Sequence, residues 1–262
     1  MNGPAPIGDF ELLATLGVTS LAALASWRVG LGRRLLWAAV RAVVQLFAIG
    51  EVLAWVLEDG AWWGVFGAMT VMVAAAAHQA VTRPERRVAG GGWGALLTLG
   101  AVGLLTVSTV TRGLLHLEPW YAPRYAIPLL GMILGNTLTG LSLAWDHLLE
   151  AADVGRAEIE ADLAEGATRW EAMRGPLERA VRVGMTPILN ATSVVGLVSL
   201  PGMMTGQILA GASPRAAVRY QLMVMLVICA ATLTATAVAG LFVVARVTDG
   251  EHRLRPPIRP GR

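Results

Sequence analysis

The stretch VRYQLMVMLVICAATLTATAVAGLFVVA, residues 218–245, decides the fold class of this chain. From Tyr220 to Ala245 it has no charged residue, and a helix of about 20 apolar residues crosses the ~30 Å hydrocarbon core of a bilayer. Of the 262 residues, 55% are hydrophobic and 15% are charged, and the mean hydropathy is +0.58. A soluble chain could not cover its surface with so few charges, since ordinary globular domains are about 25% charged. The composition therefore predicts an all-α integral membrane protein.

Six further apolar segments are long enough to cross a bilayer, so the chain is predicted to have about seven transmembrane helices. The first of these segments is the weakest, because it is free of charge only from Leu12 to Trp27. The sixth has Pro187 in its first turn, where a missing N–H costs little, and ends at the Pro201-Gly202 pair. The approximate bounds of the six are 9–27, 35–57, 61–81, 93–112, 124–145 and 184–204.

The arginines predict the orientation of these spans. All 21 basic residues are arginine, and 16 of them lie after the first, third, fifth and seventh spans. Only four lie on the other side, and arginine-rich loops stay in the cytoplasm. This predicts a multi-pass protein of the inner (plasma) membrane, with the N-terminus outside and the C-terminus in the cytoplasm. Without the first span, only the N-terminus would change sides.

One membrane domain is predicted over residues 1–245, with a cytoplasmic loop at about 146–183. The tail 246–262 is rich in arginine and proline and is predicted to be a disordered cytoplasmic segment. Because the arginines follow the topology, the basic charge is not interpreted as a nucleic-acid surface. The lipid bilayer is the expected surrounding.

The absence of lysine excludes a Walker A phosphate loop, whose lysine reaches the nucleotide phosphates. If ATP drives this protein, ATP and Mg are expected on a partner subunit, and no cofactor is expected on this chain. The single cysteine, Cys229, cannot form an intrachain disulfide or a cysteine zinc cluster. The four histidines are scattered without a metal-binding spacing, so neither a metal site nor a catalytic site is predicted.

The loop 146–183 contains Glu160, Ala161 and Gly166 at the offsets of the EAA loop of ABC-transporter permeases, which it resembles. Asp162 replaces the second alanine, and the hydrophobic-x-Leu-Pro ending of that pattern is absent. The resemblance implies a helix–turn–helix that docks into a groove of a cytoplasmic ATPase. Arg169 and Trp170 follow the turn and belong to the same implied site. The alternative is an ordinary solvated amphipathic loop.

Longer strings resemble the FetB (YbbM) family of ABC permeases over essentially the whole chain. They are GMILGNT at 131–137, NATSVVGL at 190–197 and SLPGMMTGQILAG at 199–211, together with Arg219-Tyr220-Gln221. The resemblance implies a permease that works as a dimer with two copies of a FetA-like ATPase and takes part in iron export. Plant relatives of the family are linked to aluminium tolerance and to nucleotide-sugar transport.

Polar residues inside the predicted spans are candidates for a translocation path. Thr186, Asn190 and Ser193 recur at intervals of four and three residues, so they share one helix face. The alternatives are hydrogen bonds between helices and, for Glu51, snorkelling to the headgroups. Gly131 and Gly135 form a G-x-x-x-G pair, which is interpreted as helix packing. The path candidates are Glu51, Asn136, Thr139, Thr186, Asn190, Ser193 and Gln207.

The leading functional hypothesis is therefore the permease subunit of an ABC transporter, which is not itself an enzyme. The alternative is a stand-alone secondary transporter driven by an ion gradient, since many such carriers have broken helices. Pro201-Gly202 is one candidate break, but a second half with a matching break is missing from the sequence. An intramembrane enzyme would need a catalytic pair that the spans lack, and a purely structural protein would not need the EAA-like loop.

Overall fold

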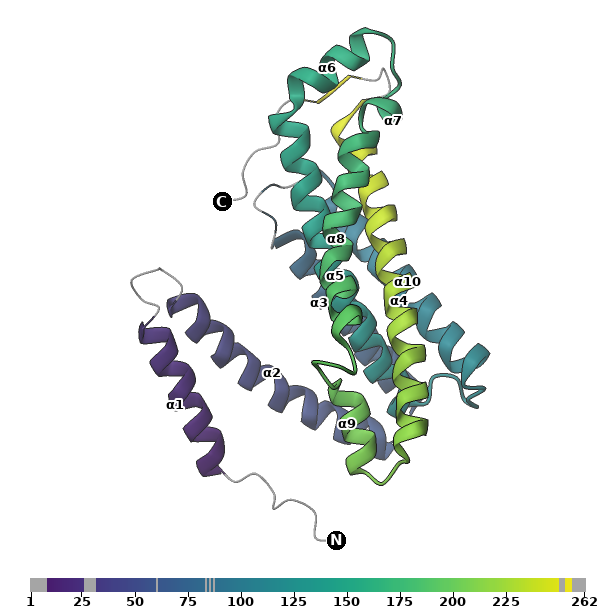
Figure 1. The fold of residues 1–262 in the computed structure, drawn as a ribbon. Coiled ribbons are helices and arrows are strands. Elements are labelled where there is room, and N and C mark those ends of the chain that lie inside the picture. The colour runs from purple at the N-terminus through teal and green to yellow at the C-terminus, as the bar shows by residue number, and fades with distance from the viewer. Residues whose placement is uncertain are drawn as a thin grey trace. The chain divides into compact units, whose positions relative to one another are not determined.

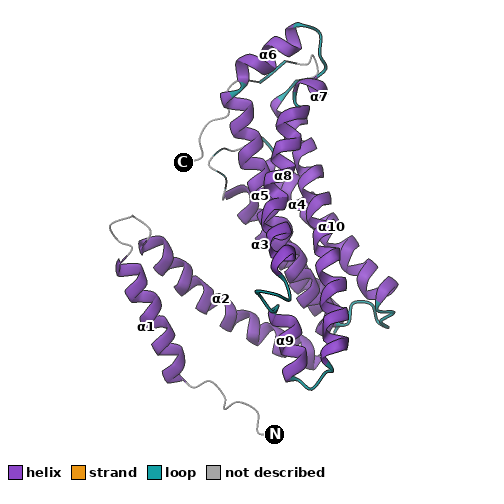
Figure 2. Cartoon of the chain, viewed as in Figure 1, coloured by secondary structure: helices purple, strands orange, loops and turns teal. Residues whose placement is uncertain are grey.

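The computed structural model confirms the all-α class. Its described part contains α-helices, one π-helical segment, connecting turns and two isolated β-bridges, and no strand (Figures 1 and 2). The chain divides into two compact units, residues 1–60 and 61–262, which are considered separately below. The structure describes residues 9–25, 32–59, 61–82, 84, 86, 88–249 and 253–255.

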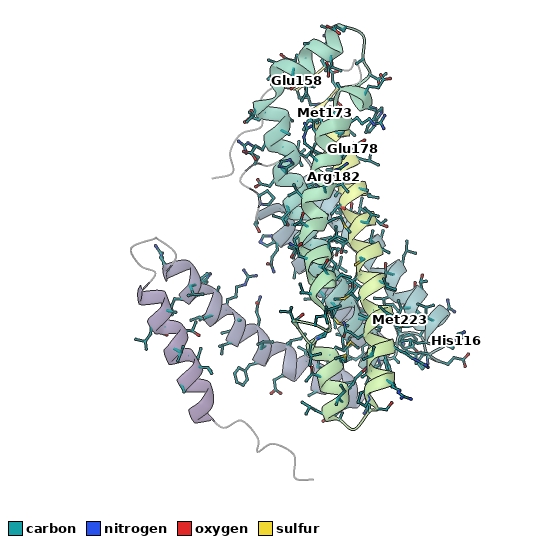
Figure 3. The ribbon with its side chains drawn as sticks, viewed as in Figure 1. His116, Glu158, Met173, Glu178, Arg182 and Met223 are labelled. Atoms are coloured by element: carbon teal, nitrogen blue, oxygen red, sulfur yellow. The ribbon has the colours of Figure 1, made fainter. Side chains whose placement is uncertain are left out.

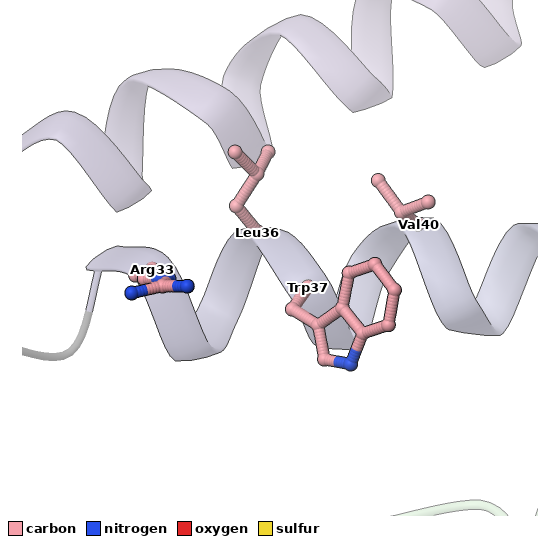
Figure 4. A pocket seen from close by; sticks show the side chains of 4 residues that line it. All are labelled: Arg33, Leu36, Trp37 and Val40. Atoms are coloured by element: carbon pink, nitrogen blue, oxygen red, sulfur yellow. The ribbon is translucent and has the colours of Figure 1, made fainter.

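The first unit contains α1 (Asp9–Ala25) and α2 (Gly32–Asp59), which contact each other. Large apolar side chains cover α2 and stay exposed, as Trp37 and Phe47 do with 69% and 65% of their surface. Figure 4 shows an open hollow on this helix, lined by Arg33, Leu36, Trp37 and Val40. The described lining residues all belong to α2 and three of the four are apolar, so we interpret this surface as lipid-facing rather than as a ligand site.

The second unit is built around α5 (Pro123–Val154), which contacts four other long helices. Leu130, Leu141 and Leu148 of α5 are fully buried, so this helix forms the centre of the core. Its neighbours are α3 (Trp62–Thr82), α4 (Gly91–Ser108), α8 (Arg174–Val194) and α10 (Pro214–Val247). The π-helical segment Thr109–Leu114 continues α4.

Five helices are long and apolar enough to cross a membrane, which supports a polytopic membrane protein. This number refers to the described residues only, and the count of seven spans stays a prediction. The predicted span 9–27 corresponds to α1, which has only 17 residues. The five helices are Leu35–Glu58, Trp62–Thr82, Gly91–Leu114, Pro123–Val154 and Pro214–Val247.

The predicted continuous span 184–204 is wrong, because α8 ends at Val194 and a separate helix, α9 (Gly202–Leu209), follows. Gly196 has a φ of +82° there, a conformation that glycine adopts readily. The amides of Leu197, Val198 and Ser199 all point to the carbonyl of Val194, at 3.4, 3.0 and 3.3 Å. The chain thus turns at Gly196 instead of continuing the helix.

Helices α5 and α8 approach each other closely at Gly140 and Gly184. A Cβ atom on Gly184 would lie 2.6 Å from the Gly140 carbonyl oxygen and 2.9 Å from a methyl group of Thr236 on α10. A Cβ atom on Gly140 would lie 2.9 Å from the Gly184 carbonyl oxygen. Only glycine lets the two backbones come this close.

The glycine pair predicted to pack against another helix, Gly131 and Gly135, is not the pair at this crossing. Only one of its two members faces a neighbouring helix in the described part of the chain. A Cβ atom on Gly131 would contact the Met72 Cε atom at 3.2 Å, so Gly131 does face α3. A Cβ atom on Gly135 would meet nothing within 4 Å among the described residues. Gly135 therefore packs against no other described part of this chain, and its packing role stays a prediction, because a G-x-x-x-G spacing fixes a shared face but not what lies against it.

The side chain of Trp145 on α5 bonds to and packs against α10. The indole N–H of Trp145 donates a hydrogen bond of 2.9 Å to the Ala239 carbonyl, and the ring stacks on Phe242 with centroids 6.1 Å apart. Only 2% of Trp145 is exposed. The indole therefore combines an apolar surface with a satisfied polar atom, as buried tryptophans usually do.

We expect Trp145→Phe to lower the thermal stability of the purified protein. The substitution removes the hydrogen bond and part of a buried ring, at a cost of about 1–3 kcal/mol. Thermal unfolding in detergent measures the effect. Trp93→Phe on α4 is the control, because Trp93 is 71% exposed. Equal melting temperatures for the two variants would contradict the assigned role.

Two arginine-bearing segments lie at one end of the second unit. Arg86 lies 3.4 Å from the Asp153 carboxylate at the end of α5, and Arg246 stacks on Phe242 at the end of α10. The other end of α5 is next to an aromatic cluster, in which Phe66 lies 5.7 Å from Trp120 between ring centroids. Which of these ends lies in the cytoplasm stays a prediction.

Candidate coupling site

The EAA-like loop folds into two short helices between α5 and α8. These are α6 (Arg156–Ala164) and α7 (Arg169–Ala172), and Gly155 and Met173 join them to the long helices. Figure 3 shows Glu158 and Met173 at this end of the unit. The predicted helix–turn–helix geometry is therefore confirmed, and we call residues 155–173 the coupling element.

Gly166 makes the turn between α6 and α7. Its φ is +97°, in the left-handed region that residues with a Cβ atom rarely adopt. The amides of Gly166 and Ala167 close the end of α6 by bonding to the carbonyls of Leu163 and Asp162, at 3.2 and 3.0 Å. This is the glycine-dependent helix end common in proteins, and it confirms the predicted need for glycine here.

A capping box starts α7. The Thr168 hydroxyl accepts the Glu171 amide at 3.4 Å, while the Glu171 carboxylate accepts the Thr168 amide at 2.8 Å and its hydroxyl at 2.7 Å. These bonds from the Thr168 amide and hydroxyl lower the pKa of Glu171 below its usual value. The turn is thus fixed on both sides of Gly166 by local hydrogen bonds.

We expect Thr168→Ala to loosen α7 without unfolding the chain. Amide hydrogen exchange of Ala172 and Met173 should accelerate by about fivefold, the typical effect of losing an N-cap. Thr70→Ala on α3, which removes a hydroxyl bonded within its own helix, should leave this exchange unchanged. Equal exchange in the two variants would contradict the capping role.

Acidification should weaken the same turn. Because the folded pKa of Glu171 is lowered, its contribution is complete above the unfolded pKa and is lost as the pH falls through the folded pKa. We expect the protection of the Ala172 amide, measured relative to its intrinsic exchange rate, to fall only below the ordinary glutamate range. Glu171→Gln should show no such pH dependence. A pH-independent exchange ratio between the two proteins would contradict this.

The buried side of the coupling element anchors it to the unit. Ile159 is 3% exposed, Ala172 6% and Met173 not at all. Trp170 is 42% exposed, with the Arg169 guanidinium 5.1 Å above its ring. The element therefore has an apolar attachment and a polar outer side.

The predicted EAA residues lie on that outer side. Ala161 is exposed, and the half-exposed Glu160 pairs with Arg156 on its own helix at 2.8 Å. Exposed acidic side chains surround them, at Glu158, Asp162, Glu165 and Glu171. An acidic surface on a rigid turn suits a partner with a basic groove.

The structure brings three of the path candidates together. Thr186, Asn190 and Ser193 are all exposed on one side of α8, as their spacing predicts. The hydroxyls of Thr186 and Ser193 donate to the carbonyls of Arg182 and Leu189 in the same helix. Within the described chain, these two hydroxyls therefore bond inside their own helix and not to a neighbouring helix.

The other path candidates are spread over three helices. On α5, the Asn136 amide donates to Met132 and the Thr139 hydroxyl to Gly135, both within the helix. Gln207 lies on the short helix α9. Glu51 belongs to α2 in the other unit.

Comparison with known proteins decides the family. The profile described as uncharacterised protein family UPF0014 matches residues 7–248. The chain belongs to the UPF0014 family. A UPF0014 membrane protein of Synechocystis is 39% identical over 83% of this chain and 85% of its own length.

Two further relatives of this UPF0014 chain have names that mention a process. The Arabidopsis thaliana protein ALUMINUM SENSITIVE 3 is 34% identical, covering 87% of this chain and 83% of its own length. The probable iron export permease protein FetB of Escherichia coli is 27% identical, covering 87% and 86%. The resemblance to FetB is thereby confirmed, and the chain is a membrane protein of a permease-like family. No solved structure matches it.

The UPF0014 chain also has polar contacts that its sequence did not indicate. The Thr192 hydroxyl lies 3.4 Å from the Cys229 sulfur and links α8 to α10. Ser142 and Thr232 bury hydroxyl oxygens without a hydrogen-bond partner in the described part of the chain. No group of three or more metal-binding side chains occurs among the residues that the structure describes.

The disorder predicted for 246–262 is wrong for the part of it that the structure describes. Helix α10 continues to Val247, and Thr248, which is 1% exposed, forms a β-bridge with Leu254. An arginine- and proline-rich composition predicts disorder from local hydrophobicity alone. Contacts to the coupling element, described below, order this segment instead.

Proposed function

We propose that this UPF0014 protein is the membrane-spanning permease subunit of an ABC transporter, which exports iron or another metal-related cargo. A separate FetA-like ATPase would bind and hydrolyse ATP with Mg, and two permease copies would assemble with it. The observation that carries the proposal is the coupling element, a rigid, acidic turn inserted between two long helices. The name of the Escherichia coli relative supports the cargo class.

The coupling element suits the transfer of motion from an ATPase. It continues directly into α5 at one end and α8 at the other, and Ile159 and Met173 fix its underside. The two helices cross in backbone contact at Gly140 and Gly184. A displacement of the coupling element would therefore move α5 and α8 together, because closely packed interfaces transmit strain.

The exposed polar face of α8 is the best candidate for the cargo path. Thr186, Asn190 and Ser193 would face a central cavity between the two permease copies. Polar side chains within a membrane need water, cargo or a partner at hand. Their oxygen atoms are hard ligands, which suit hard metal cations better than soft ones.

A secondary transporter is the second candidate, because a non-helical segment separates the end of α8 at Val194 from the start of α9 at Gly202. Broken helices at membrane depth form the ion sites of many gradient-driven carriers. Such a carrier would not need an ATPase, and this difference separates the two candidates.

Reconstitution into vesicles tests the proposal. The chain alone, the chain with the ATPase, and the chain with an ATPase lacking its catalytic glutamate are compared for ATP-driven iron transport. We expect transport only with the active ATPase and MgATP, and copurification of the two subunits. Gradient-driven transport by the chain alone, unchanged by the ATPase, would overturn the proposal in favour of the secondary transporter.

A further inference from the structure

The end of α10 is held against the coupling element by two arginines. The Arg156 guanidinium on α6 donates to the carbonyls of Arg255 and Leu254, at 2.9 and 3.4 Å. The Arg169 guanidinium on α7 donates to the Asp249 carbonyl at 3.5 Å. Both short helices of the coupling element thus bind backbone carbonyls of the chain's C-terminal segment.

The C-terminal segment has its own fixed shape at this point. Residues Thr248 and Leu254 form the bridge, and the Arg255 amide donates to the Val247 carbonyl at 2.9 Å. The Asp249 carboxylate accepts the Arg253 amide at 2.8 Å, and the Asp249 amide donates to the Arg253 carbonyl at 2.9 Å. We call residues 247–249 and 253–255 the tail clasp.

We propose that the tail clasp is a mechanical link that couples α10 to the ATPase-docking element, with Arg156 as its main positioning residue. The inference rests on the proposed function. It adds α10 to α5 and α8 as a third helix that the coupling element would move. Helices α5 and α8 are continuous in sequence with the coupling element, whereas α10 is not and is bonded to it at the clasp by Arg156 and Arg169. Since α10 packs along both α5 and α8, motion of the element would otherwise reach α10 only through side-chain contacts.

Arginine is suited to this position because its planar guanidinium can hold several acceptors at once. One Arg156 nitrogen bonds the Arg255 carbonyl, while the other lies 2.8 Å from the Glu160 carboxylate and 3.4 Å from the Leu254 carbonyl. Glu160 therefore orients Arg156 toward the clasp as well as lying on the docking surface. A lysine has three N–H donors but on one nitrogen, so it could not reproduce the two-nitrogen geometry that holds these three acceptors.

The first test uses the permease alone. In a Cys229→Ser background, Thr248→Cys places a thiol at a site that is 1% exposed while the clasp is closed. We expect Arg156→Ala to raise its labelling rate by about tenfold, as for the loss of a charge-assisted hydrogen bond. Glu160→Ala, which removes only the ion pair, should raise it by less. Unchanged labelling in Arg156→Ala would overturn the inference.

The second test separates coupling from docking. With the ATPase present, ATP-driven transport per copurified ATPase should fall by about five- to tenfold in Arg156→Ala, within the range of coupling free energies between sites. Arg156→Lys should be nearly as impaired. Normal transport in Arg156→Ala despite faster labelling would overturn the inference. Failure of the proposed function looks different, because the unmodified chain would then neither bind the ATPase nor transport with it.

Discussion

Gly166→Val should abolish ATP-driven transport and sharply reduce copurification of the ATPase, while the chain still inserts into the membrane. Gly166 has a φ of +97°, and holding a β-branched residue there costs about 1–3 kcal/mol. A Cβ atom would meet nothing within 4 Å, so the cost is conformational and not steric. The turn would relax to another backbone geometry and misalign α6 with α7.

The matched control is Gly166→Asn, which has a side chain of similar size. Asparagine tolerates the left-handed region better than other residues with a Cβ atom. We expect it to retain most of the complex and of the transport. Normal complex formation and transport in a Gly166→Val, Glu160→Ala double variant would show that the coupling element does not connect the two subunits.

Gly184→Val should prevent the second unit from forming its native core. The new Cβ atom would lie 2.6 Å from the Gly140 carbonyl oxygen and 3.1 Å from the Ala144 Cβ atom, so α5 and α8 would have to separate. Overpacking of this kind costs about 1–3 kcal/mol when side chains can move, and more when backbone is the obstacle. We expect loss of monodisperse protein on size exclusion in detergent.

Gly135→Val is the control for that experiment, since a Cβ atom there meets nothing within 4 Å. This variant replaces a glycine of α5 that does not lie at the crossing with α8. It should yield folded protein with a melting temperature close to that of the unmodified chain. Equal damage from both substitutions would show that the crossing at Gly184 is not the limiting contact.

Sequence reasoning was most reliable where the cause of a structure is local. The turn at Gly166 follows from a few neighbouring residues, and so does the shared face of Thr186, Asn190 and Ser193. The crossing at Gly140 and Gly184 could not be predicted in the same way. A glycine shows where close approach is possible, but its partner lies 44 positions away in the chain and is chosen by the whole helix packing.

The break after Val194 and the tail clasp were missed for a related reason. Hydropathy continues through Gly196, and a single glycine inside an apolar run costs a helix only about 1 kcal/mol, so the pattern predicted one span. The clasp depends on Arg156 and Arg169, which lie some 80 to 100 positions before the carbonyls that they bind. From composition alone, the C-terminal segment is predicted to be a disordered tail.

The lengths of the two central helices have a consequence for where an ATPase would attach. Helix α5 has 32 residues and α10 has 34, so each is about 50 Å long, against a hydrocarbon core of ~30 Å. We expect this surplus to extend toward α6 and α7 and to hold the acidic turn away from the lipid headgroups. An ATPase bound at its tip needs no membrane-binding surface of its own, so its attachment should be indifferent to the charge of the surrounding lipids.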